Sequence, residues 1–125
     1  MMIFEKDFLN GLLEQAAASP RLRVNCDLRN SAADTSQRML NALALGTEVP
    51  IHRHEDTAET VVCLCGRLEE IIYEQVDGDF KETQRVLLCP AEGCYGMQIP
   101  AGAWHTIRVL EPSVIFEAKD GAYKG

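Results

Sequence analysis

All three histidines of this 125-residue chain fall in two short segments, and this distribution restricts the fold more than any other feature. His52 and His54 stand two residues apart in the segment GTEVPIHRHEDTAETVVCLCG (residues 46–66), which also carries Glu59. His105 comes much later, in PAGAWH. Residues two apart in a strand project to the same face, so His52 and His54 can reach one ion. We therefore expect a fold that places His105 beside this segment and completes a metal site of three histidines and one glutamate.

Glu59 needs a change in chain direction to join this site. It has the opposite parity from the two earlier histidines and would face away from them in one continuous strand. We expect a bend at residues 55–58, with Glu59 at the start of the next strand and a tight turn at Gly66, where that strand would end. The segment PAG at 100–102 combines residues typical of turns and is expected to deliver His105 onto another strand.

The donor set predicts the class of metal. Three imidazoles and one carboxylate suit one divalent transition metal such as Zn, Fe, Mn, Ni or Co better than Mg or Ca. If the ion is six-coordinate, two positions stay open for water or substrate. The alternative interpretation is that these histidines only decorate a surface or satisfy local hydrogen bonds. The confinement of every histidine to the two segments favours the metal site.

The rest of the chain predicts an all-β domain behind one helix. Residues 4–18 show helical spacing of apolar side chains and end at Ser19-Pro20. Residues 36–45 fit helix or strand by composition, and we expect a strand because short β-runs with Gly, Pro and Asp turns follow at regular spacing. Asp77-Gly78 predicts a hairpin. The expected strands cover residues 21–26, 36–45, 49–54, 59–65, 67–76, 80–88, 95–99, 104–110 and 113–119.

These runs predict a single domain with an antiparallel β-sandwich or barrel. The expected organisation is a helix at residues 1–20 that packs on a barrel formed by residues 21–125. Contribution of this helix to a dimer contact is the alternative.

Charge and cysteine content restrict the partners and the compartment. The net charge of −7 argues against binding to nucleic acid or to an anionic membrane. The sequence has neither an apolar run of membrane-spanning length nor a signal-peptide pattern. Five cysteines, an odd number, indicate free thiols in a reducing cytosol, so we expect a cytoplasmic protein.

The first histidine segment resembles the first motif of the cupin superfamily, G-x5-H-x-H-x4-E-x6-G. Every fixed position matches, at Gly46, His52, His54, Glu59 and Gly66. This resemblance implies a single cupin domain, which is a conical β-barrel or jelly-roll sandwich with a metal inside.

The later segment resembles the second cupin motif, G-x5-P-x-G-x2-H-x3-N. Pro100, Gly102 and His105 match, whereas Cys94 and Val109 replace the leading glycine and the closing asparagine. Gly93 or Gly96 can serve the turn in place of the leading glycine, and the missing asparagine leaves the pattern of liganding residues unchanged. The superfamily resemblance therefore implies that His52, His54, Glu59 and His105 hold the metal.

A narrower resemblance covers nearly the whole chain. The leading helix, the segment RLRVNCDLRN, and QRMLNAL before PIHRHEDTAET are similar to the WbuC family of small cupin metalloproteins. The resemblance implies a context of surface polysaccharide synthesis and a sugar-related ligand, but no particular reaction.

Polar residues at strand spacing are candidates for binding a substrate. They can contact sugar hydroxyls, a carboxylate or a phosphate, and the alternative is a solvated strand face or simple packing. The candidates are Arg21, Arg23, Asn25, Gln37, Asn41, Tyr73, Gln98 and Trp104.

Two other groups have simpler interpretations. Cys63 and Cys65 share the parity of Glu59, and we interpret them as small buried apolar side chains rather than as reactive thiols or soft ligands. Glu69-Glu70 and Glu55-Asp56 are expected to be solvated charges.

Three functional hypotheses remain open from the sequence. The first is a metal-dependent isomerase, epimerase or lyase acting on a small polar molecule, with an Fe(II) dioxygenase as a variant. The second is a binding or sensor module in which the metal anchors a ligand without turnover. The third is a purely structural metal. We also expect a homodimer, by analogy with small cupins and because barrel edges offer pairing surface.

Overall fold

A computed structural model describes residues 1–121 and shows one helix followed by six strands. The elements are α1 (Lys6–Ala18), β1 (Arg23–Asp27), β2 (Ser36–Leu43), β3 (Glu59–Val76), β4 (Asp79–Leu88), the 3₁₀ turn η1 (Pro90–Glu92), β5 (Gly96–Ile99) and β6 (Trp104–Asp120). The prediction of an all-β fold with a short N-terminal helix is confirmed. Residues 122–125, which the predicted barrel domain included, lie outside the described residues.

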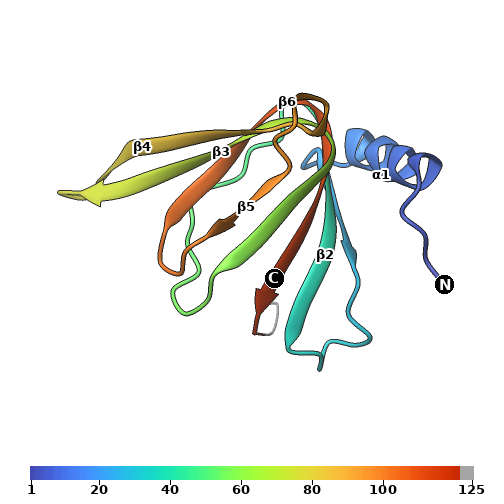
Figure 1. The fold of residues 1–125 in the computed structure, drawn as a ribbon, viewed down its shortest axis with the longest axis horizontal. Helices are drawn as coiled ribbons and strands as arrows, with labels where there is room; N and C mark the ends of the chain where they lie inside the picture. Colours follow the sequence, from blue (N-terminus) through green and yellow to red (C-terminus); the bar gives the residue numbers. More distant parts are fainter. Residues whose placement is uncertain (122–125) are drawn as a thin grey trace.

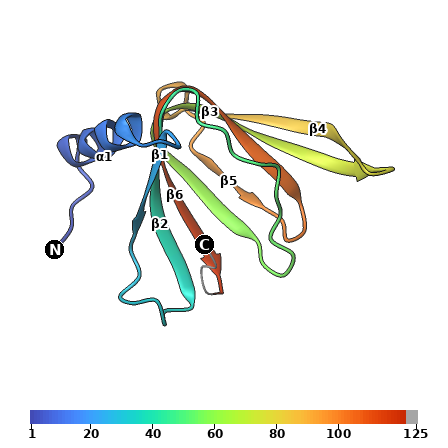
Figure 2. The ribbon, with the colours of Figure 1, turned by 180° about the vertical axis from the view of Figure 1, so that it is seen from behind.

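The strands form one antiparallel sheet in the order β1-β2-β6-β3-β4, and β5 also pairs with β3. The two longest strands, β3 and β6, pair along almost their whole length. Figure 1 shows both bending at the same end of the molecule, so that the sheet folds over into two layers. β1 and β2 belong to one layer and the β3–β4 hairpin to the other, as the view from behind in Figure 2 also shows. This folded sheet is the predicted sandwich.

The bend in β3 lies at Gly66, and the prediction that the strand ends there in a tight turn is wrong. Gly66 has a φ of +96°, and a Cβ at this position would clash with the Pro112 carbonyl oxygen and Ser113 Oγ of β6. The Ser113 hydroxyl also accepts a hydrogen bond from the Arg67 N–H at 2.9 Å. Glycine is required because β6 approaches so closely. The predicted strands 59–65 and 67–76 are consequently one strand, as are 104–110 and 113–119.

The irregular pairing around Gly66 reverses which residues of β3 face the interior. The register with β6 shifts several times between Cys63 and Leu68. Val61 and Cys63 are buried before the bend, and Leu68 and Glu70 are buried after it. An irregularity of this kind changes the alternation of side chains from odd to even positions.

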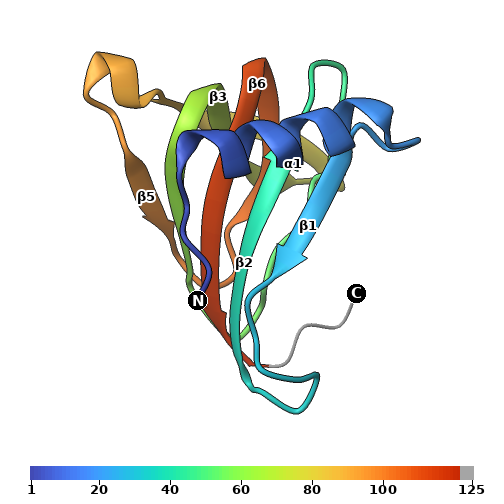
Figure 3. The ribbon, with the colours of Figure 1, turned by 90° about the vertical axis from the view of Figure 1, so that its right-hand side faces the viewer.

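Helix α1 covers the outer face of one layer, as Figure 3 shows. Its buried residues Leu12 and Ala16 pack against Leu40, Ala42 and Val114 of the sheet. These sheet residues occupy even positions in β2 and β6, so the odd positions of the same strands face the interior. The helix thus packs on the sheet through its apolar side.

A second apolar cluster lies between the two layers. Its buried members come from strands β2 to β6: Leu43, Val61, Cys63, Leu68, Leu88, Ile99 and Ile115. Cys63 is therefore part of the core, and burial raises the pKa of its thiol to about 11. This placement supports its interpretation as a small apolar side chain rather than a reactive group.

The predicted hairpin at Asp77-Gly78 joins β3 to β4. Both residues have positive φ values, 50° and 84°, which a two-residue hairpin turn requires. No helix within residues 1–121 is long and apolar enough to cross a membrane.

Candidate metal centre

Backbone hydrogen bonds join the two histidine segments. The N–H of His52 donates to the carbonyl of His105 at 3.0 Å, and the N–H of His105 donates to the carbonyl of His52 at 2.8 Å. The Gly102 N–H donates to the His54 carbonyl at 2.7 Å. Gly102 has a φ of +82° in the turn between β5 and β6, and His105 follows near the start of β6. The predicted delivery of His105 by this turn is confirmed.

Glu59 enters the site from the first position of β3. Residues 53–58 form no strand, and the chain bends at residues 55 and 56, as the parity argument required. The predicted strand 49–54, by contrast, is wrong, because His52 forms only an isolated bridge with His105. The segment is held by two backbone hydrogen bonds rather than by a ladder.

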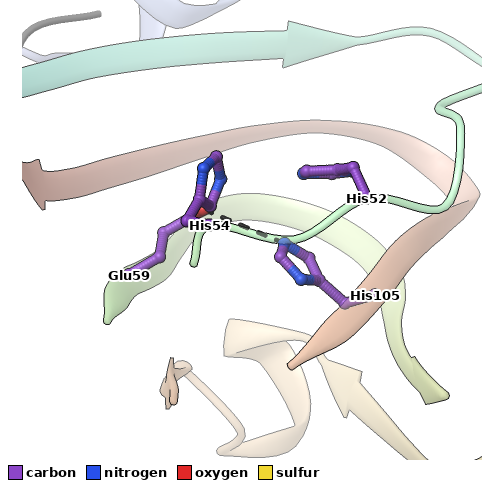
Figure 4. A group of neighbouring side chains, drawn as sticks. All are labelled: His52, His54, Glu59 and His105. Atoms are coloured by element: carbon purple, nitrogen blue, oxygen red, sulfur yellow. Dashed lines mark ion pairs between the residues drawn. The ribbon is translucent and has the colours of Figure 1, made fainter. Parts of the chain in front are cut away.

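The four predicted ligands lie together (Figure 4). One ligand atom from each of His52, His54, Glu59 and His105 lies within 4.8 Å of all the others. Glu59 Oε2 is 2.8 Å from His54 Nε2 and 3.8 Å from His105 Nε2. Glu59 and His105 are buried, whereas the other two histidines are half-exposed, so the cluster is accessible from one side.

Backbone carbonyls fix the proton on two of the imidazoles. His52 Nδ1 lies 2.8 Å from the Pro50 carbonyl oxygen, and His105 Nδ1 lies 2.9 Å from that of Ala103. A carbonyl only accepts, so each Nδ1 carries the proton and each Nε2 presents a lone pair. His105 Nε2 is buried and has no hydrogen-bond partner among the described residues. These tautomers are the ones that metal-binding histidines adopt, so the donor set fits a divalent transition metal.

Burial controls the charge of the cluster. It lowers the pKa of His54 to about 4, with further lowering by the Lys119 charge, and it also lowers the pKa of His105. Burial raises the pKa of Glu59, and the neighbouring Glu117 raises it further. Without an ion, the three groups are therefore neutral near pH 7, and only the carboxyl must lose a proton to become a ligand.

The cluster lies in the wall of a cavity of about 790 Å³ between the two layers. This volume falls within the range of small-molecule sites. Five of the eight predicted substrate-binding residues line it, all from β1, β2 and the segment before β1: Arg21, Arg23, Asn25, Gln37 and Asn41. The polar face predicted for residues 21–26 is thus turned toward the cavity, and the apolar face packs under α1.

The other three predicted substrate-binding residues do not line this cavity. Trp104 precedes His105 in β6 and contacts Phe80, with 5.0 Å between the two ring centroids. The guanidinium of Arg53 also lies over the Trp104 ring, 4.5 Å from its centroid. Tyr73 also contacts Phe80. Gln98 is exposed on β5.

The charged residues of the cavity wall that were not predicted as site residues include Glu70, Glu117 and Lys119. The expectation that Glu70 is a solvated charge is wrong, since its side chain is only 2% exposed. Its neighbour Glu69 instead pairs with Arg85. Burial and the Glu117 charge raise the pKa of Glu70 to about 8. No local signal identifies Glu70, because its inward orientation depends on the shift of parity at Gly66.

Solved structures with the same fold define the class. TT1209 from Thermus thermophilus has a TM-score of 0.66 and 22% identity, with 97% of this chain and 98% of that chain covered. The cupin domain of Schizosaccharomyces pombe Cnp3 has a TM-score of 0.55 and 11% identity, covering 79% and 64%. An oxalate oxidase in complex with the substrate analogue glycolate has a TM-score of 0.66 and 16% identity, covering 87% and 56%.

The fold and the histidine–glutamate cluster therefore define a cupin-fold protein with a candidate metal site. Residues 4–88 match a family described as Domain of unknown function (DUF6016), so the chain belongs to that family. A comparison with curated proteins finds no match.

Proposed function

We propose that this protein binds one divalent transition metal through His52, His54, Glu59 and His105 and uses it to act on a small polar molecule. The observation that carries this proposal is the lone pair of His105 Nε2, which is buried without a hydrogen-bond partner and lies close to the other three candidate ligand groups. A buried nitrogen of this kind is costly unless something binds it. When bound, the ion would supply Lewis-acid chemistry by polarising an oxygen of the substrate.

The residues around the ligands support a binding role for a polar molecule. Arg21 and Arg23 bring guanidinium groups to the cavity wall, and Lys119 adds an ammonium group. Arg23 is held in place, since its Nη1 donates to the Glu48 carbonyl at 2.7 Å. Guanidinium groups suit carboxylate and phosphate oxygens through paired hydrogen bonds.

Glu70 favours catalysis over binding without turnover. It is a buried carboxyl on the wall of the same cavity, with a pKa raised to about 8 by burial. A group that titrates near neutral pH can both accept and donate a proton, as isomerase, epimerase or lyase chemistry requires. We assign Glu70 as the candidate acid or base, and a metal-anchored binding module remains the second candidate.

The sugar-related ligand and the context of surface polysaccharide synthesis rest on the resemblance to the WbuC family. The identity of the metal decides whether an Fe(II) dioxygenase is a realistic variant of the proposal.

Elemental analysis of protein purified without chelator tests the assignment. We expect about one transition-metal ion per chain in the wild type and almost none in His54→Ala or His105→Ala. Glu55→Gln is the matched control, because Glu55 is exposed, next to His54, and paired with Arg53. Full metal content in His54→Ala would contradict the proposed ligand set.

A further inference from the structure

Four buried side-chain polar atoms within residues 1–121 have no hydrogen-bond partner, and all four belong to residues that line the same cavity. They are Gln37 Oε1, Asn41 Oδ1, Glu70 Oε2 and His105 Nε2. Buried polar atoms in folded proteins are nearly always paired, so four exceptions around one cavity indicate a missing binding partner there. The proposed metal accounts for His105 Nε2 and leaves three oxygens.

The three oxygens come from strands that are distant in sequence. Gln37 and Asn41 lie on β2, four residues apart on its inner face, opposite Lys119 and Ile115 of β6. Glu70 lies on β3 and pairs with Ile107 of β6, two residues from His105. Gln37 and Glu70 are 4% and 2% exposed, respectively. The three side chains therefore belong to the buried wall of the cavity rather than to a solvated rim.

The hydrogen-bonding capacity of the three oxygens indicates which kind of ligand they bind. The side-chain orientation of Asn41 is set by its Nδ2, which donates to Glu117 Oε1 at 3.2 Å, so Oδ1 is left as a free acceptor. Gln37 Oε1 is also an acceptor, and a carboxyl group accepts through at least one oxygen in either protonation state. The ligand must therefore bring several donors into a cavity that already holds a metal site. A hydroxyl group satisfies both demands, because it donates its hydrogen to an acceptor while its oxygen keeps lone pairs for a cation.

We infer that Gln37, Asn41 and Glu70 form a hydroxyl-recognition subsite and that the ligand is a polyhydroxylated small molecule, such as a sugar acid. The inference rests on the proposed function, since the metal would hold one end of this molecule. Arg21, which also lines the cavity, suits the acid group.

A second cation is the competing explanation for three orphaned oxygens. Oxygen ligands of this type suit Mg²⁺ or Ca²⁺. The ammonium group of Lys119 argues against a second cation. Lys119 lines the same cavity and is the cross-strand partner of Gln37. Its positive charge would repel a further cation at this place.

Matched pairs of probes test the inference on the metal-loaded protein. Gluconate and hexanoate share chain length and carboxylate and differ in hydroxyl content, as do glycerate and propionate. We expect calorimetry to show the hydroxylated member of each pair binding at least about tenfold more tightly, because the analogue leaves the buried acceptors unpaired.

Two substitutions separate the subsite from chelation by the metal. Gln37→Met and Asn41→Leu keep the size of the side chain and remove its acceptor, and each should weaken gluconate binding about tenfold without a change in metal content. Gln98→Met is the control, since Gln98 is an exposed glutamine outside the cavity. Asn41→Leu also leaves Glu117 without its donor, so Gln37→Met decides the outcome if Asn41→Leu folds poorly.

Three results would overturn the inference while leaving the proposed metal site intact. They are equal binding of the matched probes, unchanged gluconate binding in Gln37→Met, and a second equivalent of Mg²⁺ or Ca²⁺ that Glu70→Gln removes. A wild-type protein that binds no transition metal would instead overturn the proposed function.

Discussion

The backbones of His52 and His105 exchange two hydrogen bonds, of 3.0 and 2.8 Å, although 53 residues separate them in the sequence. Their ring centroids lie 4.3 Å apart. Because the backbone makes this connection, these two candidate ligands are brought together without the help of a bound ion. Preformed ligands reduce the reorganisation that metal binding requires.

Proton release should accompany metal binding, because burial raises the pKa of Glu59 in the metal-free protein. The carboxyl holds a proton at pH 7 and must lose it to bind the ion, whereas the lowered pKa values of His54 and His105 leave those imidazoles already neutral. We expect release of about one proton per ion from these three residues and an affinity that rises from pH 7 toward pH 9. Calorimetry in two buffers with different ionisation enthalpies measures this release.

Glu59→Gln provides the control for that experiment. It should remove the proton release from this position and weaken the affinity for the metal at least about 100-fold. This loss exceeds the one expected for a residue that only supports a metal ligand. Proton release unchanged by Glu59→Gln would assign the titrating group elsewhere.

The stability of the metal-free protein should fall as pH rises, because of Glu70. The pKa of Glu70 is raised from 4.5 to about 8, so between these values the folded chain holds a proton that the unfolded chain releases. This difference stabilises the unfolded state increasingly up to about pH 8. Glu70→Gln removes the effect. We expect urea denaturation to show the variant more stable than wild type by at least about 1 kcal/mol at pH 9, and little different at pH 4. Parallel pH profiles would contradict this assignment.

Gly66→Ala should be strongly destabilising. A Cβ at Gly66 would clash with the Pro112 carbonyl and Ser113, and the φ of +96° is unfavourable for alanine. We expect a loss of more than about 3 kcal/mol in the free energy of unfolding.

Gly78→Ala is the matched control for that substitution. Its φ is +84°, but a Cβ there meets no atom within 4 Å. It should cost only about 1 kcal/mol, the strain of the positive φ alone. Equal losses in the two variants, measured by circular dichroism in urea, would show that close approach of β6 is not what requires glycine at position 66.

The homodimer remains a prediction. β1 and β4 lie at the two ends of the strand order, and each has an open edge within the described residues. Exposed apolar side chains such as Val62 and Tyr95 add contact surface on the β3 and β5 side. Unpaired edges and exposed apolar groups favour association with a second copy. Light scattering should give twice the monomer mass, and a single peak at the monomer mass would rule the dimer out.

Local features of the sequence were sufficient to predict the candidate metal ligands and several elements of the fold. The spacing of His52 and His54, the parity of Glu59 and the turn at residues 100–102 depend only on bonded geometry and turn chemistry. The same holds for the helix, the Asp77-Gly78 hairpin and the two faces of β1. These features do not depend on what packs against them, so they can be predicted from the sequence alone.

The tertiary structure alone decided the composition of the cavity wall. Nothing in the sequence distinguishes Glu69 from its neighbour Glu70, yet Glu69 pairs with Arg85 and Glu70 is buried beside the candidate metal site. The pairing of β3 with β6 is irregular around Gly66, where Ser113 approaches closely, and this irregularity turns Glu70 inward. The sequence thus determined which residues could bind a metal. The pairing of β3 with β6 determined that Glu70, and not Glu69, faces the cavity with these residues. This pairing joins segments that are distant in the sequence, and a shift of one position in a strand exchanges its two faces.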